Sequence, residues 1–206
     1  MSLRKTQAER RAETQAIIMK TATQLFGEKG YNNTSVEDIA QASGMSIAPV
    51  FHYYKTKLNL FKAGSEALEE QIVPKESTGS SVGAAQILAS WRKFIEVCAD
   101  PYFRRIILVD GPNVLGRDRM YQNKVAITAR ELMLKQFGQD GLDGYKGEIL
   151  SRMTMGALAE TGFYIGQAEN TELAVKEAEE LVETMMTMLG KASAKRSEAK
   201  KGNAAT

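Results

Sequence analysis

The sequence contains very little of what catalytic and metal sites are built from. Its 206 residues include one histidine, His52, and one cysteine, Cys98. A lone cysteine excludes an internal disulfide framework and fits a reducing compartment. Because there is no second histidine and no cysteine cluster, neither a metal site nor a cofactor is expected.

Enzyme signatures are missing as well. The sequence has no phosphate-binding loop, no dinucleotide fingerprint and no evident nucleophile arrangement around its single histidine and cysteine. Asp110 and Asp118 could in principle act as a carboxylate pair, but nothing marks them beyond surface charge. An enzyme is therefore a rival interpretation that the sequence disfavours.

Long apolar runs are also absent. No run approaches the roughly 20 apolar residues of a membrane span, and the N-terminal residues lack the apolar core of a secretory signal. We therefore expect a cytoplasmic protein with no membrane partner. The 43% hydrophobic content is still enough for packed cores, and 206 residues suit one sizeable domain or two small ones.

The net charge of +2 conceals an uneven distribution. Residues 1–62 carry nine Lys or Arg against five Asp or Glu, whereas the remaining residues carry 18 against 20. A basic end on a slightly acidic body is typical of a polyanion-binding module attached to a regulatory or scaffolding body.

The stretch that begins at Ser35 organises the rest of the chain. Ser35 can cap a first short helix by accepting from the N–H three residues on, with Asp38 reaching back. Gly44 stands where that helix must end in a left-handed conformation. Ser46 then starts a second helix, in which Val50 points inward to meet the first. Two helices joined by one turn predict a helix-turn-helix, whose second helix can lie in the DNA major groove.

The remaining pattern is helical and predicts no strand, so the expected fold class is all-α. A long helix over residues 8–26 would pack across the helix-turn-helix pair and complete a three-helix head. The predicted core of that head is Ile17, Leu25, Phe26, Val36, Ile39, Val50 and Phe51. Further helices are expected over residues 58–73, 82–97, 102–109, 118–137, 146–168 and 171–190. A disordered basic tail is expected over residues 191–206.

Three blocks of sequence carry a resemblance to a known family: residues 17–31 (IIMKTATQLFGEKGY), 34–46 (TSVEDIAQASGMS) and 51–57 (FHYYKTK). In residue types, order and spacing they resemble the tetracycline-repressor (TetR) family of bacterial transcriptional regulators. Residues 108–116 (LVDGPNVLG) look like a segment of one subgroup of the family's C-terminal domains. The resemblance implies a DNA-binding domain over residues 1–56, with a basic N-terminal arm, and a ligand-binding and dimerisation domain over residues 57–190.

By this resemblance, the second helix of the pair enters the major groove of double-stranded DNA at a palindromic operator. The residues expected at the DNA interface are Ser35, Ser46, Ile47, Ala48, Pro49, Phe51, His52, Tyr53 and Lys57. Tyr53 and Lys57 match positions that usually contact the phosphate backbone, and Ser35 caps a helix whose N–H groups can meet a phosphate. His52 has two open interpretations, a contact with phosphate or a base edge and an exposed residue with no specific contact.

Ile47, Ala48 and Pro49 depart from the family, many of whose members place Lys, Gly and Thr there. Apolar side chains can read thymine methyl groups, and Pro is tolerated in a first helical turn. We therefore predict that Ser46, methyl contacts and DNA shape carry specificity. Phe51 stands where the family often has Tyr, so a hydroxyl contact would be missing.

The basic N-terminal arm, with Arg4, Lys5, Arg10 and Arg11, has two interpretations. Such arms can reach the minor groove or the DNA backbone. The alternative is a solvated, disordered leader that does not touch DNA.

The resemblance also implies a homodimer formed through the last two long helices. Independently, residues 146–168 carry small residues every three or four positions, and the following helix has an apolar face broader than one core requires. The expected dimer interface is Gly156, Ala159, Gly162, Phe163, Gly166, Leu181 and Met185. The alternative is that both faces are satisfied within one chain.

A small-molecule effector would bind between the helices of the body. The candidate pocket residues are Trp91, Phe94, Cys98, Phe103, Asp110, Asn113, Met120, Tyr121, Met133, Phe137, Met153 and Tyr164, most of which are individually more typical of plain core. This lining predicts a mainly apolar or aromatic effector. The resemblance favours repression over activation, and a DNA-binding scaffold without an effector is the second rival.

Overall fold

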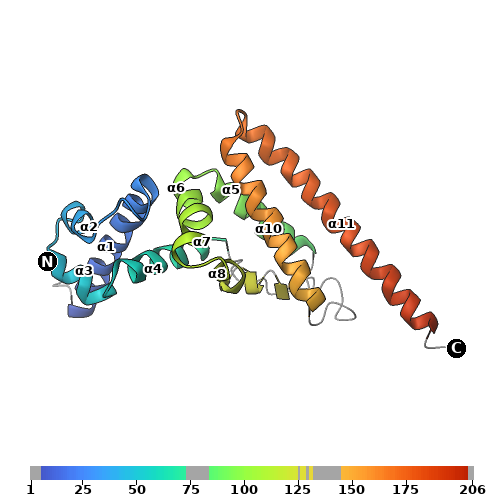
Figure 1. Ribbon diagram of the computed structural model, residues 1–206, viewed down its shortest axis with the longest axis horizontal. Coiled ribbons are helices and arrows are strands. Elements are labelled where there is room, and N and C mark those ends of the chain that lie inside the picture. The colour runs from blue at the N-terminus through green and yellow to red at the C-terminus, as the bar shows by residue number, and fades with distance from the viewer. Residues whose placement is uncertain (1–5, 73–83, 125, 129, 132–144, 204–206) are drawn as a thin grey trace. The chain divides into compact units, whose positions relative to one another are not determined.

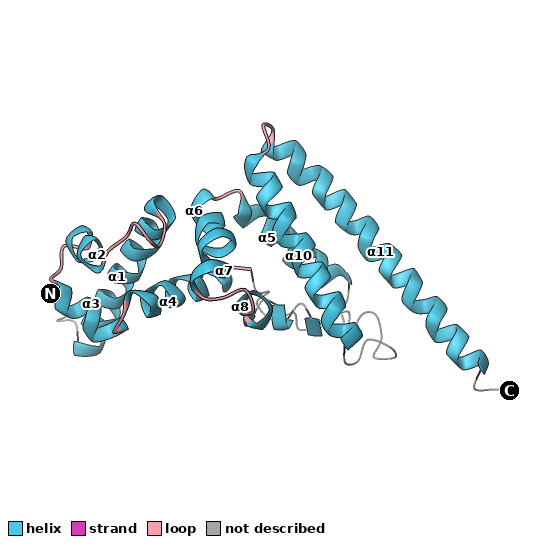
Figure 2. Ribbon diagram, in the orientation of Figure 1, coloured by secondary structure: helices cyan, strands magenta, loops and turns pink. Residues whose placement is uncertain are grey.

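The computed structural model describes residues 6–72, 84–124, 126–128, 130–131 and 145–203. Every regular element in these ranges is a helix, and none of the described residues forms a strand (Figure 2). The elements are α1 (Gln7–Lys29), α2 (Val36–Ala42), α3 (Ile47–Tyr54), α4 (Lys57–Glu69), α5 (Ala84–Cys98), α6 (Pro101–Phe103), the π-helix η1 (Arg104–Asp110), α7 (Gly111–Val114), α8 (Arg119–Gln122), α10 (Tyr145–Gln167) and α11 (Thr171–Asn203) (Figure 1). The expected all-α class is confirmed.

The chain forms two compact units. The head unit comprises Met1–Glu69 and Pro101–Arg117, and the body unit comprises Glu70–Asp100 and Asp118–Thr206. The head unit therefore includes α4 and a segment that we call the strap, residues 101–117, which contains α6, η1 and α7. The boundary expected after residue 56 would place both in the body.

Contacts between residues close together in the chain define the ends of the helices in the head. Thr6 and Glu9 form a capping box at the start of α1, with the Thr6 N–H donating to the carboxylate at 2.6 Å. Ser35 and Asp38 form the predicted box at α2: Ser35 Oγ accepts from the Asp38 N–H at 3.0 Å, and the Ser35 N–H donates to Asp38 Oδ2 at 2.9 Å. Gly44 follows with φ +69°, the left-handed conformation that the turn requires.

The head core gathers one stripe of α1, the inner faces of α2 to α4 and one strap residue. It consists of Ile18, Ala22, Leu25, Phe26, Ile39, Ala40, Val50, Leu60, Phe61 and Ile106. Two predicted core residues are exposed instead, Ile17 (40%) and Phe51 (45%). Ile18, Ala22 and Leu25 recur at helical spacing toward the core, so the adjacent Ile17 is rotated out of it.

The body unit packs α5, α10 and α11 around a second apolar core. Its buried residues are Trp91, Ile95, Ile165, Ala178 and Val182. Asn170 caps α11 as predicted, its side-chain oxygen accepting from the Leu173 N–H at 3.0 Å.

Two predicted features of the body differ from the structure. The helix expected over residues 118–137 is interrupted at Asn123, which is extended (ψ 165°) and whose side chain caps the next helical turn by accepting from the Ala126 N–H at 2.8 Å. Residues 191–203, expected to be disordered, continue α11. This segment is rich in Ala and Lys, which are strong helix formers.

Candidate nucleic-acid interface

Helix α3 presents its apolar start to the surface of the head. Val50, one turn into the helix, is buried, whereas Ile47 (37% exposed), Ala48, Phe51 (45%) and His52 face outward. Ser46 is exposed at the N-cap position, and its hydroxyl makes no capping bond to the described backbone. The outward face therefore offers methyl groups, one aromatic ring, one imidazole and one free hydroxyl for contacts with another molecule.

The second half of α3 is tied to the rest of the head. Tyr53 is half-buried, packs against the head core and lies edge-on to His52, with ring centroids 4.9 Å apart. Pro49 is also half-buried. The Tyr54 hydroxyl donates to the Gln15 carbonyl on α1 at 3.2 Å, and burial raises the pKa of Tyr54. Sequence reasoning missed this anchor, since nothing in the α3 pattern distinguishes Tyr54 from Tyr53.

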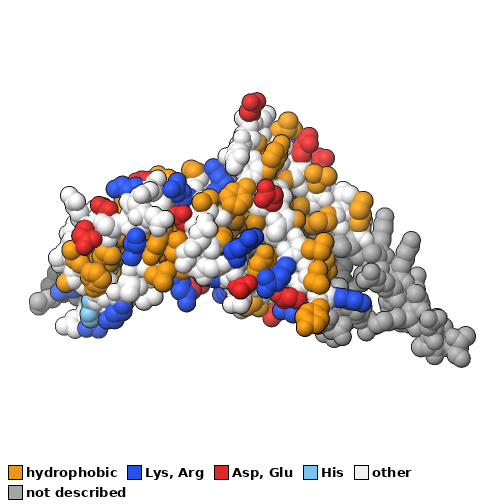
Figure 3. Space-filling view, viewed as in Figure 1, with side chains coloured by type: hydrophobic (Ala, Val, Ile, Leu, Met, Phe, Trp, Pro, Cys, Tyr) orange, Lys and Arg blue, Asp and Glu red, His pale blue; other side chains and the backbone are white. Residues whose placement is uncertain are grey.

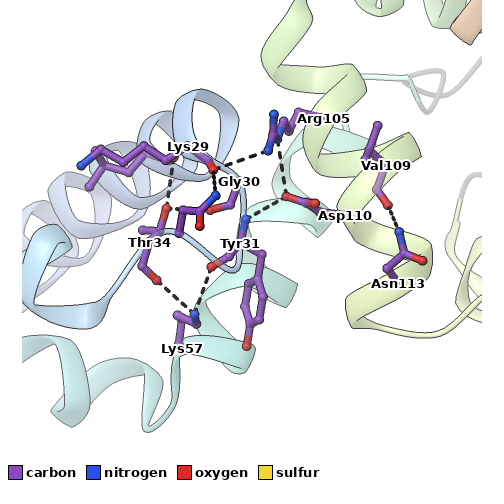
Figure 4. Close-up of polar contacts among 11 residues, drawn as sticks. Lys29, Gly30, Tyr31, Thr34, Lys57, Arg105, Val109, Asp110 and Asn113 are labelled. Carbon is purple, nitrogen blue, oxygen red and sulfur yellow. Dashed lines mark hydrogen bonds and ion pairs between the residues drawn. The ribbon is translucent and has the colours of Figure 1, made fainter.

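Lys57, predicted to contact phosphate, is held by the head itself. Its ammonium donates to the carbonyls of Tyr31 and Thr34, both at 3.0 Å, and lies 4.1 Å from the centroid of the Tyr31 ring (Figure 4). The first residue of α4 thus joins the loop before α2. An ammonium has three N–H donors, so one is left beyond these two bonds.

The start of α2 carries a fixed negative group. Hydrogen bonds from the backbone and side chain of Ser35 hold the pKa of Asp38 below its ordinary value, and the charge of Lys29 lowers it further. Asp38 therefore stays ionised at neutral pH beside the helix end that was predicted to face a phosphate. Of the predicted arm, Arg10 and Arg11 are exposed in the first turns of α1, and Arg4 and Lys5 lie outside the described residues.

The predicted ligand-pocket residues fall in both units. Phe103, Asp110 and Asn113 belong to the head unit and the others to the body unit, while Met133 and Phe137 lie outside the described residues, as does the side chain of Met120. Within the head, Phe103 is buried, the Asp110 carboxylate accepts from the Tyr31 N–H at 2.8 Å, and the Asn113 amide donates to the Val109 carbonyl at 2.7 Å.

Within the body, the predicted pocket residues divide into buried and exposed sets. Trp91 stacks on Phe94 with centroids 6.0 Å apart, and Cys98 is fully buried. Trp91 Nε1 is buried and has no hydrogen-bond partner among the described residues. By contrast, Met153 (66%) and Tyr164 (70%) are exposed.

Tyr121 and Arg152 form a small polar cluster in the body. The Arg152 guanidinium lies 4.4 Å from the centroid of the Tyr121 ring and also pairs with Glu148 at 2.7 Å and Asp118 at 3.5 Å. Asp118 is thus part of an exposed ion-pair network. In the described part of the chain, no group of three or more His, Cys, Asp or Glu side chains is placed to hold a metal ion.

The residues predicted for a dimer interface lie along α10 and α11. Gly162 is buried within the body, and Ala159, Phe163, Gly166 and Met185 are half-buried. Gly156 faces open space, since a Cβ there would meet nothing within 4 Å. Leu181 is 70% exposed.

Exposed apolar side chains recur on the same two helices. They are Tyr145, Ile149, Met153 and Tyr164 on α10, and Leu173, Leu181 and Met188 on α11. Figure 3 shows hydrophobic side chains along the visible face of these helices. None of the described helices has an apolar stretch that could cross a membrane.

Two family models match the chain. The one described as "Bacterial regulatory proteins, tetR family" matches residues 18–63, and the one described as "Tetracyclin repressor-like, C-terminal domain" matches residues 84–189. A curated relative, the HTH-type transcriptional regulator CymR of Pseudomonas putida, is 40% identical over 72 residues. That match spans 35% of this chain and 36% of CymR, or about a third of either protein.

Solved structures share the fold over most of the chain. A TetR-family transcriptional regulator from Pectobacterium atrosepticum has a TM-score of 0.58 at 22% identity, covering 90% of this chain and 97% of that one. The fatty acid degradation regulator FadR from Bacillus halodurans has a TM-score of 0.64 at 16% identity, covering 87% and 96%. MexZ, described as a key repressor responsible for antibiotic resistance in Pseudomonas aeruginosa, has a TM-score of 0.62 at 18% identity, covering 86% and 94%.

Proposed function

The chain belongs to the tetR family of bacterial regulatory proteins and is a DNA-binding transcriptional regulator, and from this premise we propose that it is a repressor whose homodimer holds a palindromic operator. The observation that carries the proposal is the outward face of α3, where Ile47, Ala48, Phe51 and His52 are exposed together on a capped helix-turn-helix. A recognition helix meets base edges with its N-terminal residues. We place its site of action in the cytoplasm.

The proposed base readout is mainly apolar. Ile47 and Ala48 would contact thymine methyl groups, and Ser46 would supply a hydroxyl for either donor or acceptor edges. Phe51 and His52 extend the same face by one turn. Tyr53 would contact the DNA backbone from the half-buried side of α3, beside Pro49.

The proposed phosphate contacts lie at the starts of α2 and α4. Ser35 caps α2, whose N-terminal N–H groups are suited to a phosphate, although the Asp38 carboxylate opposes an anion there. Lys57 keeps one N–H donor beyond the two that hold loop carbonyls. Arg10 and Arg11 could add screened, sequence-independent attraction.

Two heads are needed because one α3 reads a single half-site. The proposed dimer joins α10 and α11 of one chain to the same helices of a second copy, as a two-fold interface. The exposed apolar residues Leu181, Tyr164 and Met153 support this, since several large apolar side chains exposed on one helix pair are typical of an interaction site. The open space over Gly156 would admit a partner side chain.

The proposed effector is a small, mainly apolar or aromatic molecule bound among the helices of the body. Trp91 and Phe94 would form its aromatic wall, with Cys98 nearby on the same helix. The Trp91 indole N–H supports an effector with one hydrogen-bond acceptor, because a buried donor without a partner is costly. An effector that binds more tightly to a dimer whose heads are wrongly spaced for the operator would weaken DNA binding. DNA would weaken the binding of the effector by the same factor.

Selection of bound sequences from a random DNA pool tests the DNA-binding proposal. We expect a palindrome whose half-sites are about 10 base pairs apart centre to centre, or a multiple of this, with A·T pairs under Ile47 and Ala48. Phe51→Ala should change the preferred bases within each half-site, whereas an exposed change on α4, Lys62→Ala, should leave them unchanged. A site in which G·C pairs under α3 are indispensable would contradict the apolar readout.

A thermal-shift screen separates a sensor from a scaffold. The full chain would be screened against aromatic and aliphatic carboxylates, alcohols and amides, and each stabilising compound tested for release of the selected operator. At least one compound should do both. If stabilising compounds all leave the DNA complex intact, the effector part of the proposal fails and a DNA-binding scaffold becomes the better interpretation.

A further inference from the structure

Tyr31 is the residue at which the loop between α1 and α2 is held from several sides (Figure 4). Its N–H donates to Asp110 Oδ2 at 2.8 Å, and its carbonyl accepts from Lys57 Nζ at 3.0 Å. Its ring packs against those of Phe61 and Phe26, with centroids at 5.0 and 5.8 Å. The capping residue Ser35 follows four residues later, so these contacts hold the loop that leads into α2.

The Asp110 contact joins residues 79 positions apart in the chain. Asp110 is the last residue of η1, and its side chain is only 18% exposed. Arg105, one turn earlier in the strap, lies 3.9 Å from the same carboxylate oxygen and donates to the Lys29 carbonyl at 3.4 Å. A carboxylate that accepts a backbone N–H forms one of the stronger protein hydrogen bonds. The strap thereby satisfies polar backbone groups on both sides of Gly30.

The end of α1 is shaped to admit the strap. A Cβ at Gly30, where φ is +82°, would lie 2.5 Å from Arg105 Nη2. A Cβ at Gly27 would lie 2.6 Å from the Cβ of Tyr102, whose hydroxyl donates to Glu28 at 3.2 Å. Two close approaches at glycine, one helical turn apart, give the strap a defined register on α1.

From this geometry we infer that Asp110 and Arg105 are positioning residues for DNA binding. They hold the loop between α1 and α2 that contains Tyr31. Through this loop they hold the start of α2 and the Lys57 ammonium in the arrangement that meets the operator. The strap lies within the range matched by the C-terminal family model, whereas Tyr31 lies within that matched by the N-terminal one, so the Asp110 carboxylate connects the two at a single peptide group. The inference rests on the proposed DNA-binding function.

The test compares Asp110→Ala, Asp110→Asn and Val109→Ala in the full chain. Val109 is the matched control, because it precedes Asp110 on η1 and its side chain is 41% exposed. Asp110→Ala should weaken binding to the selected operator about tenfold, as expected for loss of a hydrogen bond to a charged group, and should speed hydrogen exchange at the Tyr31 amide. Asp110→Asn keeps an acceptor for the Tyr31 N–H and should recover most of the affinity, and Val109→Ala should match the wild type.

Three results would overturn the inference. They are wild-type affinity for Asp110→Ala, a loss of affinity with unchanged exchange at the Tyr31 amide, and an equal loss in all three variants. If Asp110→Ala does not fold, Arg105→Met replaces it, since it removes the guanidinium contacts but keeps an unbranched apolar side chain. Wild-type affinity for this variant would again overturn the inference. Failure of the wild-type protein to select any DNA would instead count against the proposed function, and the Tyr31 exchange rate would still test the contact.

Discussion

At the scale of single residues, neighbours of the same chemistry lie in opposite environments. Ile18 is fully buried in the head core, while Ile17 is 40% exposed; Val50 is buried, while Phe51 is 45% exposed. One residue of an α-helix corresponds to a rotation of about 100°, so Ile17 and Phe51 are turned away from the core that Ile18 and Val50 face. This leaves Phe51 available on the outward side of α3.

The isoleucine pair gives a matched stability test. Ile18→Ala should cost about 2–5 kcal/mol of unfolding free energy, because it removes buried methyl groups and leaves a cavity. Ile17→Ala should cost about 0.5 kcal/mol or less, as for a surface change. Urea denaturation of the full chain measures both. Equal costs for the two variants would show that the α1 stripe is assigned in the wrong register.

Lys57 combines a structural contact with a proposed DNA contact. Lys57→Met keeps an unbranched apolar side chain but removes the ammonium that lies over the Tyr31 ring. We expect the slope of log affinity against log salt to become shallower by about 0.9 for each phosphate that the protein no longer neutralises, so by about twice that for a dimer. Titrations of the operator over a salt series measure the slope. An unchanged slope with reduced affinity would mean that Lys57 acts only by holding the loop carbonyls.

At the scale of elements, short-range polar contacts define where the head helices begin. Each capping box closes within three residues: Thr6 with Glu9 at α1, and Ser35 with Asp38 at α2. The start of α3 lacks such a bond, which leaves the Ser46 hydroxyl available for DNA in the proposed function. Helix η1 adds a π-type turn in which the Gly111 N–H donates to the Ile106 carbonyl. It brings Ile106 to the head core and Asp110 to Tyr31.

The α2 cap should make stability depend on pH in the acid range. The pKa of Asp38 is lowered in the folded state, so its contribution is fully present above its ordinary value of 3.8 and is lost as the pH falls through the lower folded pKa. Below about pH 4, the midpoint temperature of thermal unfolding should fall more steeply with decreasing pH for the wild type than for Asp38→Asn, which keeps an acceptor but does not titrate. Parallel curves for the two proteins would contradict this role for Asp38.

At the scale of the whole molecule, the division into two units does not follow the order of the chain. The strap follows α5 in the chain but belongs to the head unit, so the head unit contains helices from both of the ranges that the two family models match. The body unit is left with an exposed apolar surface on α10 and α11. This surface is where we propose that a second copy binds.

The dimer proposal predicts the effect of a charge on that surface. Leu181→Asp should convert the protein to a monomer, because an interface does not tolerate an unpaired buried carboxylate. Ile127→Asp, at a residue 49% exposed outside α10 and α11, should remain dimeric. Light scattering on the eluting peak of a sizing column measures the mass. A dimeric Leu181→Asp would place the interface elsewhere.

The sequence by itself determined what depends on residues close together in the chain. The Ser35–Asp38 box and the Asn170 cap are contacts within four residues, and the left-handed conformation of Gly44 is a property of one residue. Residue type and spacing therefore suffice to predict them. The all-α class followed from the same helical periodicity, and the TetR resemblance from three ordered blocks over residues 17–57.

Only the tertiary structure decided how distant segments meet. Periodicity placed Ile17 in the predicted core of the head, whereas the structure buries its neighbour Ile18, because the buried side of α1 is the one that the other helices cover. Asp110 was a candidate ligand anchor by sequence, yet its carboxylate binds the Tyr31 N–H 79 residues away. Such a contact requires the strap to pass over two glycines at the end of α1, and local residue spacing does not constrain that approach.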